Sequence, residues 1–164
     1  MARKSAILIP VIIAAVAVGG LGISFIPAEV REPERTEFSK GTVKIDDNVI
    51  TVEIADTSAE RQRWLTFRQD RLANDTALLL KYEESDLHQV WMLNIEYNLD
   101  LIWMDKEGNV VYLIKDAPPC QNVVETVSCT YKTTSRSLYV MASNAGFIDA
   151  QGITIGSKMT IISI

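Results

Sequence analysis

The sequence predicts a small, mainly β domain of the α+β class, in which an antiparallel sheet curls into a barrel-like form with one or two short helices. Two observations predict this domain: apolar and polar residues alternate along much of the chain after residue 41, and turn-forming residues separate the short runs. A third observation, an uncharged apolar run from Ala6 to Ile26, predicts one transmembrane helix before the domain. The expected organisation is therefore an anchor at 1–26, a linker at 27–40 and a domain at 41–164.

The apolar run has the length of a membrane helix. Its 21 residues would form a helix of about 31 Å, which matches a hydrocarbon core of about 30 Å. Arg3 and Lys4 precede the run and the first acid after it is Glu29. Since the positive end stays in the cytoplasm, we expect a single-pass protein of the cell membrane with its C-terminal domain outside the cytoplasm. The alternative is a cleaved signal peptide, with Gly22-Ile23-Ser24 as a possible cleavage site.

After a charged linker that carries two prolines, the pattern predicts short strands and little helix. The expected strands, in order, are 42–46, 49–55, 76–82, 88–93, 99–104, 110–115, 137–143 and 158–164. Thr57 and Glu60 fit a capping box that opens a short helix reaching about Phe67. Residues 144–151 could form one or two helical turns, closed by Gly152. This order favours a barrel or sandwich and not a βαβ fold.

Charge narrows the range of partners. Beyond Lys4 the chain has 14 basic and 21 acidic side chains, a net charge of −7, and no cluster of Lys or Arg. Such a domain is a poor nucleic-acid binder, because binding to phosphates requires a basic face. It is equally unsuited to lying flat on an anionic lipid surface. The expected partners are the membrane, through the N-terminal helix, and an envelope ligand or protein.

The two cysteines, Cys120 and Cys129, both lie in the part expected outside the cytoplasm. There an even pair predicts a disulfide, and closing so short a loop contributes about 2–3 kcal/mol. Free thiols and a metal site are the alternatives. A metal site would need more ligands, but His88 is the only histidine and no CxxC or HxxxH spacing occurs. We therefore expect no metal and no cofactor.

Several short motifs occur in an order and spacing typical of one family. They are Val52-Glu53-Ile54-Ala55-Asp56-Thr57, Glu60-Arg61, Arg63-Trp64-Leu65, Trp91-Met92-Leu93-Asn94, Leu99-Asp100, Ala117-Pro118-Pro119-Cys120 and Asn144-Ala145-Gly146-Phe147. Over about 42–164 the chain resembles the DUF192 family, a set of small proteins of unknown function. The resemblance implies a compact, β-rich, often exported domain and supplies no catalytic residues. The family has Gly at the position of Trp64 and Lys at that of Leu93, so any role of that lysine is missing here.

Four residues form the expected ligand-binding site: Trp91, Asn94, Asp100 and Asn144. Asp100 lies among apolar neighbours, where a carboxylate is either a ligand acceptor or a structural acid that accepts backbone N–H groups. Trp91 could stack on a sugar ring or, like Trp103, belong to the core. Asn94 and Asn144 could line a polar cleft or make turn hydrogen bonds.

The leading function hypothesis is a membrane-anchored, non-enzymatic domain of the cell envelope that binds a ligand or a partner. One alternative is a hydrolase of envelope polymers, which would take its two carboxylates from Glu53, Glu60, Glu96 and Asp100. Another is a structural accessory subunit of a membrane complex. Asn74-Asp75-Thr76 is an N-glycosylation sequon, which makes Asn74 a candidate modification site.

Overall fold

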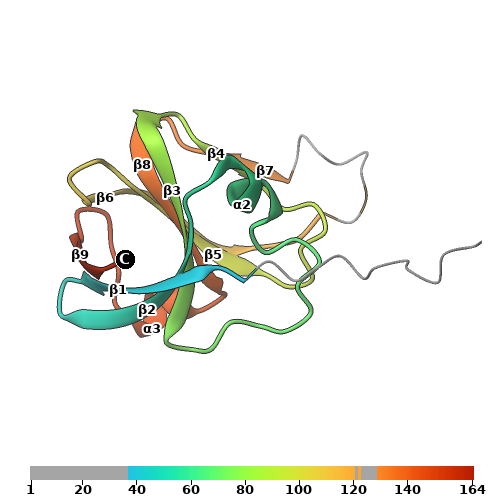
Figure 1. Ribbon diagram of the computed structural model, residues 1–164, viewed down its shortest axis with the longest axis horizontal. Helices are drawn as coiled ribbons and strands as arrows, with labels where there is room; N and C mark the ends of the chain where they lie inside the picture. Colours follow the sequence, from blue (N-terminus) through green and yellow to red (C-terminus); the bar gives the residue numbers. More distant parts are fainter. Residues whose placement is uncertain (1–36, 121, 123–128) are drawn as a thin grey trace, which may run out of the picture. The chain divides into compact units, whose positions relative to one another are not determined.

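A computed structural model describes residues 37–120, 122 and 129–164 (Figure 1). The segment Thr36–Ile164 forms one compact unit. The expected membrane helix at 6–26 and most of the expected linker lie outside the described residues. Within the described ranges, no helix is both long and apolar enough to cross a membrane.

The described part of the chain contains nine strands and two short helices. In order they are β1 (Ser39–Ile45), β2 (Asn48–Ala55), α2 (Ser58–Arg63), β3 (Thr76–Asp86), β4 (Gln89–Trp91), β5 (Leu99–Met104), β6 (Val110–Ala117), β7 (Thr130–Lys132), β8 (Ser137–Asn144), α3 (Phe147–Ala150) and β9 (Met159–Ser163). Seven strands form a sheet of order β6-β5-β8-β3-β2-β1-β9, and β4 pairs with β7 in a separate ribbon. The prediction of a mainly β domain with short helices is confirmed.

The sheet is mixed: most neighbours are antiparallel, as expected, but one pair is parallel. Strands β2 and β3 pair in parallel, from Thr51 opposite Thr76 to Ala55 opposite Leu80. Parallel neighbours need a crossover of about a dozen residues or more, and α2 with residues 64–75 supplies it. The chain therefore contains one β2-α2-β3 unit, although the order of many short strands favoured a fold without βαβ units.

Helix α2 begins with the predicted capping box. The Thr57 hydroxyl accepts from the Glu60 backbone N–H at 3.2 Å, and the Glu60 carboxylate accepts from the Thr57 N–H at 3.0 Å. The helix ends at Arg63, before the predicted end near Phe67. Trp64 and Leu65 leave the helix and bury their side chains, and their burial outweighs the continuation of the helix.

The sheet separates two hydrophobic cores. Leu99, Leu101 and Trp103 on β5 face the first core, which also receives side chains from β4 and from the segment after α2. Ile102 and Met104 face the second core, which lies on the other side of β5 and includes residues of β1, β2 and α3. Alternation along one strand thus serves two cores, so β5 is buried throughout.

The curl of the sheet brings the β5–β6 turn against the start of β9. Met159 donates its N–H to the Gly108 carbonyl at 2.8 Å, and Val110 donates to the Ser157 carbonyl at 2.8 Å. A Cβ at position 108 would lie 2.3 Å from the Met159 carbonyl oxygen, so the close approach requires glycine. Beyond this corner β6 and β9 do not pair in the described part of the chain, and the sheet is not a closed barrel.

Strand β7 is absent from the strands expected from the sequence. Its three residues are too few to show alternation, and the strand exists because it pairs with β4, with Trp91 opposite Thr130. The adjacent disulfide between Cys120 and Cys129 is confirmed, with a Cα–Cα distance of 5.5 Å.

Candidate functional site

The segment after α2 contacts two of the four residues expected to bind a ligand, Asn94 and Asn144, and Trp91 lies three residues before Asn94. We define the loop end as segments 64–73 and 92–98 together with Trp91 and Asn144. The Phe67 N–H donates to the Asn94 carbonyl at 2.8 Å. The Asn144 amide Nδ2 donates to the Leu72 carbonyl at 2.6 Å. The segment after α2 therefore contacts both the loop that carries Asn94 and the end of β8.

Two residues of the loop end have left-handed backbone conformations and are hydrogen-bonded to each other. Phe67 has φ 59° and Asn94 has φ 57°. Asparagine tolerates this region, but for a bulky residue it costs about 1–2 kcal/mol. The Phe67 side chain is 62% exposed, so its own burial does little to offset the strain. Strain that is held in place without local compensation is typical of functional surfaces.

Trp91 adds a second exposed aromatic ring. Its side chain is 44% exposed, whereas Trp103 is fully buried and donates its Nε1–H to the His88 carbonyl. The core interpretation therefore fits Trp103 and not Trp91. The next residue, Met92, donates its N–H to the Cys129 carbonyl and accepts from the Cys120 N–H. The disulfide thus fixes the backbone from which Trp91 projects.

Asp100 is diagonal to Asn144 across the β5–β8 pair, but its side chain points to the opposite face of the sheet. It is fully buried on the face of β5 that points to the second core. One carboxylate oxygen accepts from the Asp116 N–H at 2.9 Å and the other accepts from the Ile148 N–H at 2.8 Å. Asp100 therefore joins the end of β6 to the start of α3 as a structural acid that accepts backbone N–H groups.

Two buried polar atoms near the end of β8 have no hydrogen-bond partner in the described structure. They are the Asn144 Oδ1 and the Ser143 Oγ. An unpaired buried acceptor costs about 1–3 kcal/mol, and such atoms are rare enough to require a reason. The Asn144 side chain packs beside Leu72, so its unpaired oxygen lies at the base of the loop end. Ser143 is opposite Asp100 on the neighbouring strand.

Arginine and tyrosine side chains complete the loop end. The Arg71 guanidinium lies over the Tyr97 ring at 5.4 Å, and the Tyr97 hydroxyl donates to the Asp70 carbonyl at 3.3 Å. Burial raises the pKa of Tyr97, so it stays a hydrogen-bond donor at neutral pH. Arg68 forms an ion pair with Glu53, which raises the pKa of the guanidinium.

The carboxylates considered for hydrolysis have separate structural roles. Glu53 pairs with Arg68, and Asp100 binds two backbone N–H groups. Glu60 caps α2, and its hydrogen bonds from Thr57 hold the pKa of its carboxyl below the usual value. Glu96 lies exposed in the loop before β5. The described residues contain no group of three or more acids, cysteines or histidines suited to a metal.

Asn74, the candidate glycosylation site, lies exposed in the turn immediately before β3. The sequon is therefore accessible in the folded domain.

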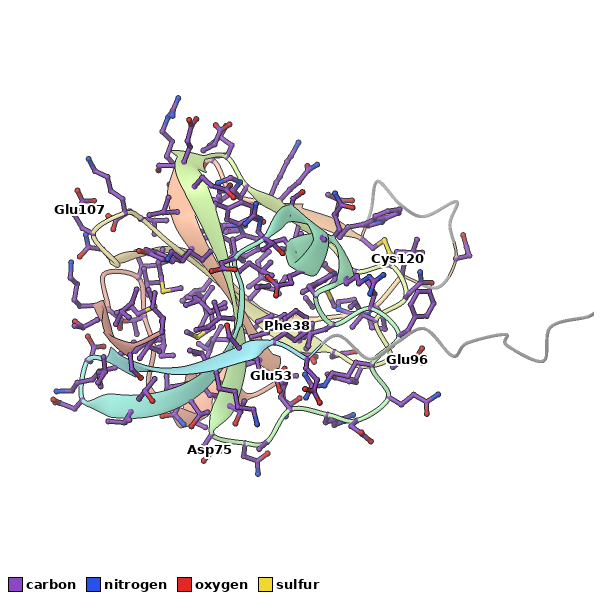
Figure 2. The ribbon with its side chains drawn as sticks, in the orientation of Figure 1. Phe38, Glu53, Asp75, Glu96, Glu107 and Cys120 are labelled. Carbon is purple, nitrogen blue, oxygen red and sulfur yellow. A yellow bond between two sulfur atoms is a disulfide. The ribbon has the colours of Figure 1, made fainter. Side chains whose placement is uncertain are left out.

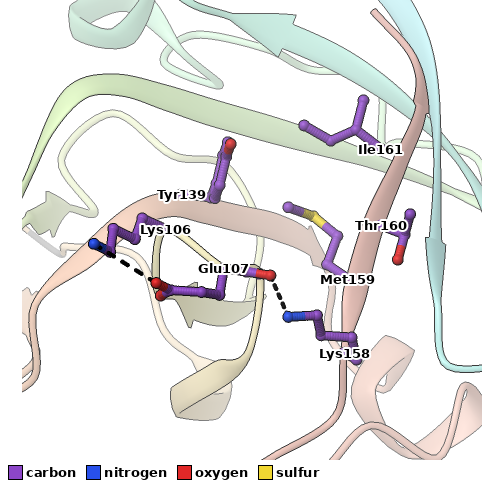
Figure 3. Close-up of a pocket in the computed structure, with 8 residues that line it drawn as sticks. Lys106, Glu107, Tyr139, Lys158, Met159, Thr160 and Ile161 are labelled. Atoms are coloured by element: carbon purple, nitrogen blue, oxygen red, sulfur yellow. Dashed lines mark hydrogen bonds and ion pairs between the residues drawn. The ribbon is translucent and has the colours of Figure 1, made fainter.

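The structure also contains an open groove that the sequence did not predict (Figure 3). It has a volume of about 340 Å³ and lies between the β5–β6 turn, Tyr139 of β8 and the first residues of β9. Lys158 Nζ donates to Asn109 Oδ1 at 3.1 Å and to the Glu107 carbonyl, so its charge is partly engaged within the groove wall. No sequence signal marked this groove, because three segments distant in the chain line it.

The loop end and the groove lie at different ends of the domain. Figure 2 shows Glu96 and Cys120 at one end of the long axis and Glu107 near the other. A ligand in the groove would therefore not contact Trp91 or Asn94.

Comparison with solved structures shows two folds of this kind. A "putative transcription regulator" from Sinorhizobium meliloti 1021 is 21% identical with a TM-score of 0.68, covering 77% of this chain and 96% of that one. A protein of unknown function from Novosphingobium aromaticivorans DSM 12444 is 23% identical with a TM-score of 0.67, covering 79% of this chain and 89% of that one. At these identities the likeness shows the fold alone. No curated protein matches the sequence.

A family model matches residues 41–161, which is nearly the whole described domain. The motif residues have defined places in the fold. The capping box opens α2, Asp100 accepts from the start of α3, and Trp91 and Asn94 belong to the loop end. The chain therefore belongs to the DUF192 family, described as "Uncharacterized ACR".

Proposed function

We propose that this protein is a membrane-anchored, extracytoplasmic binding module of the cell envelope, without catalytic activity, that meets its partner through the loop end. The observation that carries the proposal is Phe67, a strained residue with a largely exposed aromatic side chain. The strained backbone at Phe67 gains nothing from packing of its own side chain. Such strain is typical of residues whose exposed side chain takes part in binding.

The composition of the loop end supports binding more than catalysis. Exposed aromatic residues and arginine are the types enriched at the centres of binding surfaces, since they offer large contact area and several donors. Phe67, Trp91 and Arg71 are of these types. The Asn144 oxygen at the base of the loop end adds an unused acceptor. The nearby acids have roles in helix capping and ion pairing.

The sequence and the disulfide support the location outside the cytoplasm. The apolar run from Ala6 to Ile26 and the two basic residues before it predict an anchor with the domain on the outer side. The Cys120–Cys129 disulfide fits that side, because disulfides persist in oxidising compartments and are rare in the cytosol.

Two measurements test the proposal. The full-length chain should stay in the membrane pellet after alkaline extraction, and release of a fragment that begins near Phe25 would show a cleaved signal peptide. For the loop end, thermal unfolding should be compared with and without chitotriose, glycerophosphocholine and a short acidic peptide as probes. We expect one probe to raise the Tm of the wild type and of Ile155→Ser, but not of Trp91→Ser or Asn94→Ala. A shift that survives both loop-end substitutions would contradict the proposed surface.

A further inference from the structure

We propose that the groove between the β5–β6 turn and β9 binds a small free monocarboxylate with an apolar body, whose carboxylate meets the Lys158 ammonium group. Glu107 of this groove lies near the opposite end of the domain from the loop end (Figure 2). The groove is therefore a second site, independent of the function proposed for the loop end. It has three features suited to such a ligand: an apolar floor, a positioned cation and a rigid corner that holds both.

The floor of the groove consists of Tyr139, Met159 and Ile161. Met159 is buried in the second core, and Tyr139 and Ile161 are partly buried against the same core. Figure 3 shows Tyr139 on one wall, with Met159 and Ile161 of β9 on the other. Because two of these side chains are still partly exposed, an apolar group in the groove would remove apolar surface from water. A volume of about 340 Å³ is near the lower limit for small-molecule sites, so the apolar body is one ring or a short chain.

Lys158 provides a cation whose position is fixed by two neutral acceptors. Its Nζ donates to the Asn109 Oδ1 at 3.1 Å and to the Glu107 backbone carbonyl. The Asp105 carboxylate accepts from the Asn109 Nδ2 at 2.8 Å, and this bond directs the Asn109 oxygen toward Lys158. An ammonium group has three donors. Within the described part of the chain, one N–H of Lys158 therefore remains for a ligand oxygen.

The charges that line the groove match a single negative charge. Two lining residues are basic, Lys106 and Lys158, and one is acidic, Glu107, which gives a net charge of +1. Lys106 Nζ lies 3.7 Å from the Glu107 carboxylate, so these two charges offset each other. Among the ion pairs of the described residues, none involves Lys158. A monocarboxylate complements this charge, whereas the Glu107 carboxylate would repel a phosphate dianion more strongly.

The corner that holds the cation and the floor is fixed by backbone hydrogen bonds. Gly108 accepts from the Met159 N–H at 2.8 Å and donates to the Asp105 carbonyl at 3.0 Å. Val110 donates to the Ser157 carbonyl at 2.8 Å. These bonds hold the β5–β6 turn against β9 without a ligand. A site that is already formed binds with less loss of conformational entropy.

NMR titration of the full-length protein tests the proposal, with 3-phenylpropionate as the probe and a nonionic detergent to keep the apolar run in solution. This probe combines one ring, a short chain and one carboxylate. We expect the largest backbone amide shifts at Gly108, Met159 and Ile161, and none at Trp91 or Asn94. The neutral analogue 3-phenylpropionamide should bind at least about tenfold more weakly, since it cannot form a charge-assisted hydrogen bond through a carboxylate.

Two substitutions separate the cation from the floor. Lys158→Met removes the charge and keeps an unbranched side chain, so the Kd of 3-phenylpropionate should rise about tenfold while that of the amide stays the same. Lys132→Met, on β7, makes the same change in net charge away from the groove and should bind like the wild type. Ile161→Thr keeps a β-branched residue in β9 and should weaken both probes, because it makes the floor more polar.

Three outcomes would overturn the proposal: no amide shifts at the groove residues, equal affinity for the carboxylate and the amide, or an unchanged Kd of 3-phenylpropionate in Lys158→Met. Urea unfolding shows whether each variant is folded, and the shifts of the wild type decide the site if a variant is not. The alkaline extraction and the loop-end probes do not involve the groove. Failure of this proposal and failure of the proposed function are therefore distinguishable.

Discussion

Replacing Phe67 by glycine should leave the domain more stable than replacing it by alanine, the reverse of the usual order. Both substitutions remove the same aromatic packing, which is small because Phe67 is 62% exposed. Alanine keeps the left-handed strain at φ 59°, whereas glycine relieves it.

The magnitude follows from two opposing terms. Relief of the left-handed conformation contributes about 1–2 kcal/mol. The greater freedom of glycine in the unfolded chain costs about 0.5–1 kcal/mol. The free energy of unfolding should therefore be higher for Phe67→Gly than for Phe67→Ala by about 0.8 kcal/mol, the middle of a range of about 0–1.5 kcal/mol.

The assay is urea unfolding of the compact unit Thr36–Ile164, followed by circular dichroism. Gln62, an exposed residue inside α2, provides the control, since there glycine should be less stable than alanine by about 1 kcal/mol. If glycine is the less stable variant at both positions, Phe67 is not strained and the main support for the loop end as a functional surface is lost.

The remaining predictions concern the buried acid, the disulfide and pH. Asp100→Asn should lower the free energy of unfolding by about 2 kcal/mol, because an amide cannot accept both backbone N–H groups. Ser143→Ala should not lower the free energy of unfolding and should raise it, because it removes the desolvation cost of a buried hydroxyl that has no partner in the described structure. The double variant Cys120→Ser/Cys129→Ser should have a free energy of unfolding lower by about 2–3 kcal/mol, and dithiothreitol should have no further effect on its Tm. The pKa of the Glu60 carboxyl is lower in the folded state than its ordinary value of 4.5. The contribution of ionised Glu60 to the free energy of unfolding is therefore fully present above pH 4.5 and is lost as the pH falls through the folded pKa. Glu60→Gln should flatten the acid side of a Tm-versus-pH curve, and an unchanged curve would contradict the capping role.

Local patterns predicted much of the fold. The capping box at Thr57, the strand Leu99–Met104 and the disulfide pairing all depend on residues close in sequence, and each is found in the structure. The parallel pairing of β2 with β3 depends on how a 20-residue connection crosses the sheet. Periodicity gives the same pattern for a strand in either direction, so it could not reveal this pairing.

The residues of the candidate site were also only partly predictable from the sequence. The sequence singled out Trp91, Asn94, Asp100 and Asn144 because their residue types are unusual in their settings. It missed Phe67, since nothing in the sequence shows that a phenylalanine after a short helix has a positive φ and an exposed side chain. It also could not separate Asp100 from the others, because the direction of a side chain relative to two cores depends on packing.

By itself, the sequence determined the family, the β-rich character, the cysteine pairing and the case for a membrane anchor, because composition and short-range pattern are enough for each. The tertiary structure decided that the sheet is mixed and open, that Asp100 is a buried acceptor between β6 and α3, and that Phe67 and Trp91 are exposed whereas Trp103 is buried. These features arise from contacts between segments that are distant in the chain. Their free energies depend on close packing and hydrogen-bond geometry, which no local pattern contains.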